Sequence, residues 1–391
     1  MLGSFGSSSH EEEEEPSPPN VYLHQIQPRS LASPPIHMRQ LLISCAELIS
    51  RSDVSAAHRL IGILVSNSSP YGDSTERLVH QFTKALRLRL NRGEQGCNDE
   101  ALLQSSYLSL NQITPFIRFS QLTANQAILE AIEGQQAIHI LDFDIMHGVQ
   151  WPPLMQALAE RFPPPTLRIT GTGTDLDILR RTGDRLAKFA HSLGLRFQFQ
   201  PLISDESISV TSSVVLLPHE TLAVNCVHYL HRLLKDRDRL HLFLHRIKAM
   251  GPRVVALAER EANHNHPVFQ QRFVEAVDHY AAVFDSLEAT LPPNSRERLG
   301  VEQIWFGREI SDIVAAEGEN RKERHERFRS WEMMLRSAGF GNVALSPFAL
   351  SQAKLLLRLH YPSEGYHLHI LNNSFFLGWQ NQPLFSVSSW R

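Results

Sequence analysis

The chain has 391 residues, with 38 Lys and Arg against 41 Asp and Glu, so its formal net charge is −3. Hydrophobic residues make up 42% of it, which is enough apolar material for at least one large core. The near balance of charge excludes a polycation that grips nucleic acid by charge alone. Any contact with DNA must therefore come from a local patch or from a partner protein.

Residues 1–35 are expected to form a disordered tail. They concentrate Ser, Glu and Pro, include an acidic run at 11–15, and lack apolar periodicity. Such a composition buries too little apolar surface to offset the conformational entropy of the chain. The stretch also lacks the basic and apolar regions of a secretory signal, so no such signal is expected.

The cysteines and the hydropathy pattern bear on the compartment. Cys45, Cys97 and Cys226 are odd in number and share no C-x-x-C spacing, which favours a reducing compartment over a disulfide framework. No apolar run approaches the roughly 18 residues that a membrane-spanning helix needs. We therefore expect an intracellular protein without a membrane partner.

Residues 36–112 are expected to form a helical cap. Apolar side chains recur at three- and four-residue spacing over 38–49, as on one face of an amphipathic helix. A second helix is expected at about 55–64. Asp73 or Ser74 can cap a third helix, whose end alternates like a strand and leaves its boundary open.

Residues 113–391 are expected to form an α/β core. The core begins with a helix that has Thr114 at the N-cap, Pro115 at the first helical position and Gly134 just past its end. Short apolar runs then alternate with helical segments, which predicts right-handed crossovers and a mostly parallel sheet. The expected strands are 137–144, 167–173, 195–200, 213–218 and 253–259, and 222–234 is expected to be a helix.

The chain is expected to end in an antiparallel hairpin. Asn372 and Asn373 lie between two strand-like runs, as in a tight turn. A parallel sheet that finishes in this way is typical of Rossmann-type, methyltransferase-like folds, a likeness that says nothing about activity. Trp390 is next to last and would fray unless it docks, so we expect it to be buried in a strand of the sheet.

The most informative segment is IHILDFDIMHGVQWP at 138–152, at the carboxyl end of the first expected strand, where open α/β sheets bind ligands. A nucleotide-type cofactor would need a glycine-rich turn there, but only Gly148 is present and Phe143 and Ile145 crowd the turn. The second strand should then end in an acid that holds a ribose, and it ends instead in TGTG. No cofactor is therefore expected.

Polar side chains of this segment are the candidate site residues, namely His139, Asp142, Asp144, His147, Gln150 and Trp151. Asp142 and Asp144 could form a carboxylate pair, but alternate residues of a strand point to opposite faces, so structural roles are as well supported. In one interpretation Asp142 accepts hydrogen bonds from backbone amides at the start of the next helix and Trp151 packs. In the other, the loop supports a partner-binding surface. Neither involves catalysis.

Other motifs give no stronger chemistry. A dinucleotide fingerprint is only partly matched at 171–174. His325 and Glu326 begin a zinc-protease motif whose second histidine is missing, and His241 and His245 share a helix face without an evident third ligand. No metal site is therefore expected.

The charged run ENRKERHER at 319–327 interleaves acidic and basic residues. This pattern is typical of a helix face exposed to solvent, where ion pairs are weak. We expect a solvated helix here, with a partner or phosphate contact as the alternative.

Taken together, these segments resemble the plant GRAS family. IHILD at 138–142 is similar to its VHIID motif, with Leu141 replacing the second isoleucine, a change that should be neutral for packing. Residues 69–90 and 222–234 resemble the family's two leucine-rich regions, and residues 272–289 and 307–318 resemble its PFYRE block. Residues 323–340, 377–385 and 388–390 resemble its SAW region, and they contain Trp331, Trp379 and Trp390 respectively. The resemblance covers 36–391, in family order.

The resemblance implies a plant transcriptional regulator in the nucleus, with the cytoplasm as a second location. Family members work largely through other regulators, as homo- or heterodimers, and some contact promoter DNA directly or through partners. The short tail without a DELLA segment resembles the Lateral suppressor and SCARECROW-like branch, which implies a role in axillary and shoot meristem development. The implied fold is a Rossmann-type core with an N-terminal helical cap.

Two classes of function remain open. One is a non-enzymatic regulator that uses its fold as an interaction scaffold. The other is an S-adenosylmethionine-dependent methyltransferase, or another small-ligand binder, on the same fold. The missing glycines and the missing acid favour the first class, so no catalytic residue is expected.

Overall fold

The computed structural model of the chain describes residues 34–91, 100–204, 211, 213–292 and 294–391. Residues 1–33 of the expected tail lie outside the described residues. Its last two residues, 34 and 35, are the first two of helix α1. Within the described ranges, no helix has both the length and the apolarity that crossing a membrane requires.

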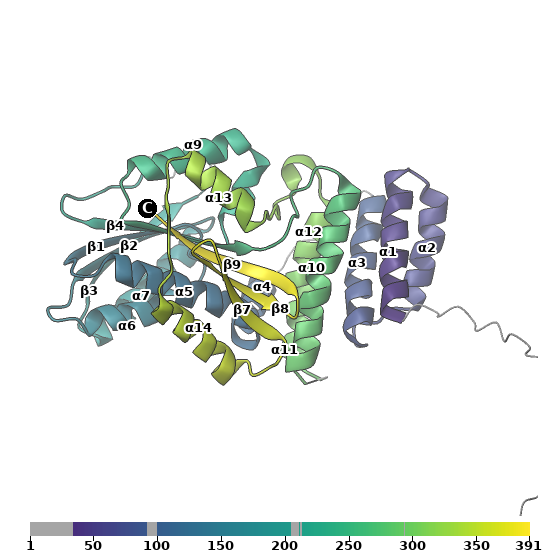
Figure 1. Cartoon of the computed structure of the whole chain (residues 1–391), viewed down its shortest axis with the longest axis horizontal. Helices are drawn as coiled ribbons and strands as arrows, with labels where there is room; N and C mark the ends of the chain where they lie inside the picture. Colours follow the sequence, from purple (N-terminus) through teal and green to yellow (C-terminus); the bar gives the residue numbers. More distant parts are fainter. Residues whose placement is uncertain (1–33, 92–99, 205–210, 212, 293) are drawn as a thin grey trace, which may run out of the picture.

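One mixed sheet organises the molecule (Figure 1). Its strand order is β3-β2-β1-β4-β5-β9-β8-β7, with β6 beside β9. The first five strands of this order are parallel, whereas β9, β8 and β7 run antiparallel to their neighbours. The bounds are β1 Ala137–Asp142, β2 Thr166–Gly173, β3 Arg196–Ile203, β4 Thr221–Val227, β5 Val254–Arg260, β6 Asn342–Val343, β7 Tyr366–Leu371, β8 Ser374–Trp379 and β9 Gln382–Trp390. The expected Rossmann-type α/β fold is confirmed.

Helices cover both faces of this sheet (Figure 1). Helices α5, α6 and α7 pack on one face, and η1, α9 and α13 on the other, each through its own apolar cluster. The bounds here are α5 Pro115–Ala131, α6 Trp151–Ala159, α7 Leu176–Ser192, η1 Leu230–Lys235, α9 Arg237–Ala249, α13 Phe328–Ser337 and α14 Pro347–His360.

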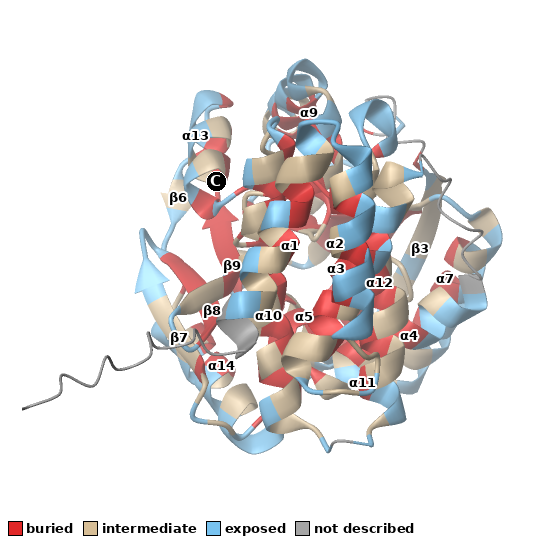
Figure 2. Ribbon diagram, turned by 90° about the vertical axis from the view of Figure 1, so that its right-hand side faces the viewer, coloured by how far each residue is buried: buried red, intermediate tan, exposed pale blue. Residues whose placement is uncertain are grey.

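The helical cap draws on two distant parts of the chain. Helices α1 to α4 come from residues 34–113, whereas α10 and α12 come from residues 269–315. Helix α3 packs against both α10 and α12 (Figures 1 and 2). The ring of Phe82 on α3 meets those of Phe273 and Tyr280 on α10, with centroids 5.5 and 6.3 Å apart. The bounds are α1 Pro34–Ser50, α2 Val54–Ser66, α3 Ser74–Leu90, α4 Glu100–Ile113, α10 Phe269–Thr290, α11 Arg296–Gly300, η2 Val301–Phe306, α12 Gly307–Ala315 and η3 Gly318–Asn320.

Two predicted elements are wrong. The expected helix 222–234 is strand β4 followed by the short helix η1, and the expected strand 213–218 has no regular structure. A short apolar run fits a buried strand as well as a buried helix. Pairing with β1 on one side and β5 on the other makes β4 a strand.

The C-terminal hairpin is confirmed. Asn372 and Asn373 join β7 to β8 with φ of 46° and 62°, the left-handed values that a tight hairpin turn needs. Trp390 has no exposed surface and pairs with Val255 of β5, so the expected burial of the last strand is confirmed as well.

Candidate functional site

The chain turns sharply after β1, at the edge where the candidate residues gather. Asp144 and Met146 have φ of 65° and 48°, a region that side chains other than glycine seldom enter. The backbone amide of Asp144 donates to Oγ1 of Thr172 over 3.0 Å and ties the turn to the end of β2. Backbone strain of this kind concentrates at functional sites.

A buried polar network supports this turn. The carboxylate of Asp142 accepts one hydrogen bond from Trp151 Nε1 and one from Asn225 Nδ2, each 2.8 Å long. Nε2 of Gln150 donates to Oδ1 of Asn225 and of Asn125, over 2.9 and 3.1 Å. Asp142 is therefore held by side chains, and the expected hydrogen bonds from backbone amides of the next helix are wrong. Burial raises the pKa of Asp142 to about 7.

Asp142 and Asp144 line the same cavity. The expectation that they point to opposite faces is wrong because β1 ends at Asp142, so strand alternation no longer governs Asp144. Asp144 accepts a hydrogen bond from Arg232 Nη1 over 2.5 Å, and this ion pair neutralises its charge.

Two other candidates from this segment lie elsewhere. His139 is buried on the opposite face of β1, where Nε2 lies 2.8 Å from Thr170 Oγ1 and Nδ1 lies 3.1 Å from Arg168 Nη2. Burial and the Arg168 charge lower the pKa of His139 to about 4. The half-buried His147 has its Nδ1 3.4 Å from Nε2 of Gln104 and does not line the cavity.

The three tryptophans of the SAW-like region are buried but do not form one site. Trp331 and Trp390 belong to the apolar cluster beneath α9 and α13, whereas Trp379 belongs to the cluster shared with the cap. Their indole N–H groups donate to separate acceptors, namely Glu326 O, Ser388 Oγ and Asp285 Oδ2. Each of the three indoles therefore packs within an apolar cluster and has its N–H satisfied.

The cavity at the carboxyl edge of the sheet has a volume of about 60 Å³. Side chains from α4, α5, β1 and the turn after it, β4, β5, η1, η2, α12, β9 and the segment before α13 line it, among them Gln150, Asn225, His228, His231, Arg260, Arg308, Glu309, Glu323 and His325. It can hold a few water molecules, but pockets for small organic ligands measure roughly 300–1,000 Å³.

The charged run 319–327 contributes to this cavity, so the expected solvated helix is wrong. Arg321, Glu323 and His325 are at most 5% exposed, and only the first residues of the run are helical. Arg321 Nη1 donates to the carbonyl oxygen of His264 over 2.6 Å. Alternating charges resemble a surface pattern, but here only Glu319, Lys322 and Arg327 of the charged residues are exposed, whereas Arg321, Glu323, Arg324, His325 and Glu326 are buried.

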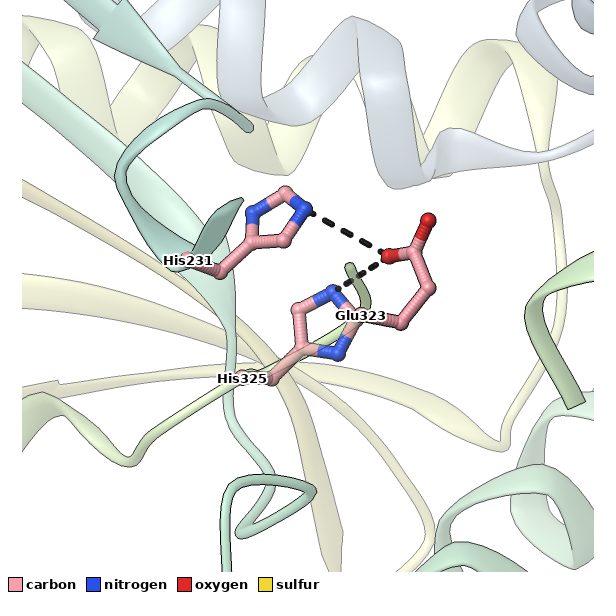
Figure 3. Close-up of side chains that lie close together, drawn as sticks. All are labelled: His231, Glu323 and His325. Atoms are coloured by element: carbon pink, nitrogen blue, oxygen red, sulfur yellow. Dashed lines mark ion pairs between the residues drawn. The ribbon is translucent and has the colours of Figure 1, made fainter. Parts of the chain in front are cut away.

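Two histidines and a glutamate meet in this wall of the cavity (Figure 3). Oε2 of Glu323 lies 3.4 Å from Nε2 of His231 and 3.4 Å from Nε2 of His325. Burial alone would lower the pKa of His231, but Glu259 and Glu323 outweigh it and raise that pKa to about 9. The sequence gives no spacing signal for this cluster, because His231 lies on η1, roughly 90 positions before the other two.

The comparisons with known proteins agree along the chain. The profile of the GRAS domain family matches residues 38–391. Scarecrow-like protein 18 of Arabidopsis thaliana is 54% identical over 90% of this chain and 91% of its own length. Protein MONOCULM 1 of Oryza sativa subsp. japonica is 46% identical over 90% of this chain and 88% of its own. The crystal structure of SCL7 in Oryza sativa aligns with a TM-score of 0.79, at 35% identity over 90% of this chain and 99% of that one.

Proposed function

Since the chain belongs to the GRAS domain family of plant regulators, we propose that it is a nuclear transcriptional regulator that acts as a protein-interaction scaffold in shoot and axillary meristem development. The observation that carries the proposal is the likeness to two regulators over nine tenths of the chain. The rice relative is named for a single culm, that is, an unbranched shoot, which supports the developmental part. Promoter DNA is reached directly or through partner regulators, including second copies of such chains.

The edge of the sheet supports a scaffold over a methyltransferase. A glycine-rich turn after β1 would leave open space for a cofactor, but the side chain of Ile145 occupies this space. It packs so closely against β2 that a Cβ added to Gly171 would lie 2.8 Å from Ile145 Cδ1. The acid nearest the end of β2 is Asp175, which caps α7 by accepting from the amides of Asp177 and Ile178 over 2.8 and 2.9 Å. Among the described residues, this leaves neither a cofactor turn after β1 nor a free ribose-binding acid at the end of β2.

The alternative is an S-adenosylmethionine-dependent methyltransferase or a binder of another small ligand. The position of the cavity favours it, because open α/β sheets bind ligands at the carboxyl ends of their strands. The small volume argues against an adenosyl ligand unless the turn after β1 moves.

The proposal is tested in rice plants that lack MONOCULM 1. The chain is fused to a fluorescent protein and expressed from the promoter of the missing gene. We expect fluorescence in nuclei, restored side shoots and altered transcript levels in the shoot apex. The matched control is the same fusion with a nuclear export signal, which should restore nothing. Full rescue by the exported control, or no change in transcripts with the nuclear form, would contradict the proposal.

A further inference from the structure

We propose that His231, Glu323 and His325 bind a divalent transition-metal ion of the zinc class in the wall of the cavity (Figure 3). All three side chains are buried, and their ligand atoms lie within 4.8 Å of one another. Two imidazoles and one carboxylate are a ligand set that such ions commonly take in proteins.

The spacing of the ligand atoms suits a tetrahedral ion. Glu323 Oε2 lies 3.4 Å from each of the two Nε2 atoms of His231 and His325. Zinc bonds of about 2.0–2.2 Å at tetrahedral angles place neighbouring ligand atoms about 3.3–3.5 Å apart. The ligand atoms of the two histidines themselves lie within 4.8 Å of each other. The rings of His231 and His325 have centroids 4.4 Å apart at 30°, so one imidazole must turn for both Nε2 atoms to reach one ion.

A second layer of residues holds each ligand in orientation. Nδ1 of His231 lies 2.8 Å from Oε2 of Glu259, the carboxylate–histidine arrangement that fixes which imidazole nitrogen faces a metal. Nδ1 of His325 lies 3.0 Å from Nδ1 of His264. The second carboxylate oxygen of Glu323, Oε1, faces Arg308 Nη2 at 3.7 Å. In each ligand, the remaining polar atom is already engaged.

The charge around the cluster favours a bound cation. Arg232 pairs with Asp144 and Arg260 with Glu309, so these two guanidinium charges are compensated. Glu259 and Glu323 then face the histidines, and Arg308 lies 3.7 Å from Glu323, while the charges of Arg232 and Arg260 also act on that carboxylate. A proton on His231 or a metal ion in its place offsets the negative charge of the two carboxylates.

A fourth ligand position opens toward the cavity. The three ligands and Arg260 all line it, and Nη1 of Arg260 has no hydrogen-bond partner among the described residues. Arg260 is 5% exposed, so this buried donor needs a polar occupant of the cavity. Water or a small anion on the metal would meet that need.

The experiment uses the full chain with H241A/H245A, because these exposed histidines lie one helical turn apart on α9 and can bind zinc adventitiously. The protein is stripped with a chelator and titrated with Zn²⁺ alone by calorimetry, and with Co²⁺ by visible absorption. We expect one ion per chain, with the intense absorption of four-coordinate Co²⁺ and a raised thermal midpoint.

Two variants in the same background locate the ion. E323Q removes the charged ligand and should weaken Zn²⁺ binding at least tenfold, whereas E319Q makes the same change at an exposed position of the same segment and should leave it unaltered. Circular dichroism reports whether E323Q folds. Should it not fold, the Co²⁺ spectrum of the parent protein decides.

Three results would overturn the proposal. The first is no ion retained by the H241A/H245A chain, and the second is a six-coordinate, weakly absorbing Co²⁺ spectrum. The third is unchanged Zn²⁺ affinity in folded E323Q. Each would leave the cluster as a buried ion pair of His231 with Glu259 and Glu323.

Discussion

The carboxylate of Asp142 is buried, so water cannot replace a lost hydrogen bond. Its two oxygens accept hydrogen bonds from Trp151 and Asn225. Asp142→Asn replaces one acceptor oxygen by an NH2 group, so the N–H of Trp151 or of Asn225 loses its acceptor and the two new amide hydrogens face that donor. We expect a loss of about 1–3 kcal/mol in the free energy of unfolding at about pH 8. Urea denaturation measures this loss, and the control is Asp177→Asn at an exposed position. If the two variants are equally stable, the hydrogen-bond network around Asp142 does not hold the turn.

His231 gives the protein a pH dependence of known sign. Its pKa rises from about 6.5 to about 9 on folding, so its contribution to stability is complete below about pH 6.5 and is lost as the pH rises through about 9. His231→Gln should therefore cost on the order of 3 kcal/mol more at about pH 6 than at about pH 10. Denaturation in the presence of a chelator measures the difference.

The control for this measurement is His191→Gln, at an exposed histidine of α7, which should change stability little at either pH. A cost of His231→Gln that is the same at both pH values would contradict the assignment of a charged, buried imidazolium to this position.

For individual residues, the sequence could indicate where the candidate site lies, but not which side chains form hydrogen bonds and ion pairs with one another there. The segment 138–152 marks the correct edge of the sheet because parallel strands end there together. Asp142 takes one of its two partners, Asn225, from β4, and Glu323 meets His231 from η1, at sequence distances with no local periodicity. Such contacts are set by the tertiary fold alone.

The last strand ties the C-terminus into the sheet. Trp390 has no exposed surface, packs near Phe328 and donates to Ser388 Oγ over 2.9 Å. Trp390→Ala should lower the free energy of unfolding by about 3–5 kcal/mol, as for other buried aromatic truncations. The control is Phe348→Ala on α14, where the ring is 59% exposed. Similar small losses for both would show that β9 is not part of the core.

A buried ion pair joins helix α3 to η2, two elements far apart in the sequence. Nε and Nη2 of Arg77 on α3 donate to the two carboxylate oxygens of Glu302 on η2, over 2.8 and 3.2 Å, and both residues are 1% exposed. Arg77→Met leaves Glu302 buried without this partner and should cost about 3–5 kcal/mol. The double variant R77M/E302M should recover most of that loss.

A double-mutant cycle from urea denaturation tests this coupling, with Arg87→Met at an exposed position of the same helix as control. Additive losses in the R77M/E302M double variant would contradict a direct coupling between α3 and η2.

Among the elements, helices with local caps were predicted well and short apolar runs were not. Asp73 caps α3 as expected, because its side chain accepts from the amide of Glu76 within one turn. The strand β4 was missed because an apolar run of seven residues has no distinguishing period when both faces are buried. The burial of Arg321, Glu323 and His325 escaped prediction for a related reason, since alternating charge does not reveal partners from other elements.

On the scale of the whole molecule, the cap and the sheet form one core. A continuous apolar cluster runs from Leu42 on α1 through Phe82 and Phe284 to Val387 on β9. The order of the motifs could predict the α/β class and its antiparallel end, because alternating strands and helices leave few topologies. That α10 and α12 return to cover α3 could not be predicted, since nothing local specifies which helices pair.

We propose that this α/β fold serves regulation without an adenosyl cofactor. Isothermal titration of the full chain with S-adenosylmethionine tests it most directly, with S-adenosylhomocysteine in parallel. The turn after β1 is crowded and the cavity measures only about 60 Å³. We therefore expect no heat of binding from either ligand, even at the highest protein concentration that remains soluble. Binding with a Kd of about a micromolar, lost in Asp142→Asn under conditions where that variant remains folded, would contradict the claim.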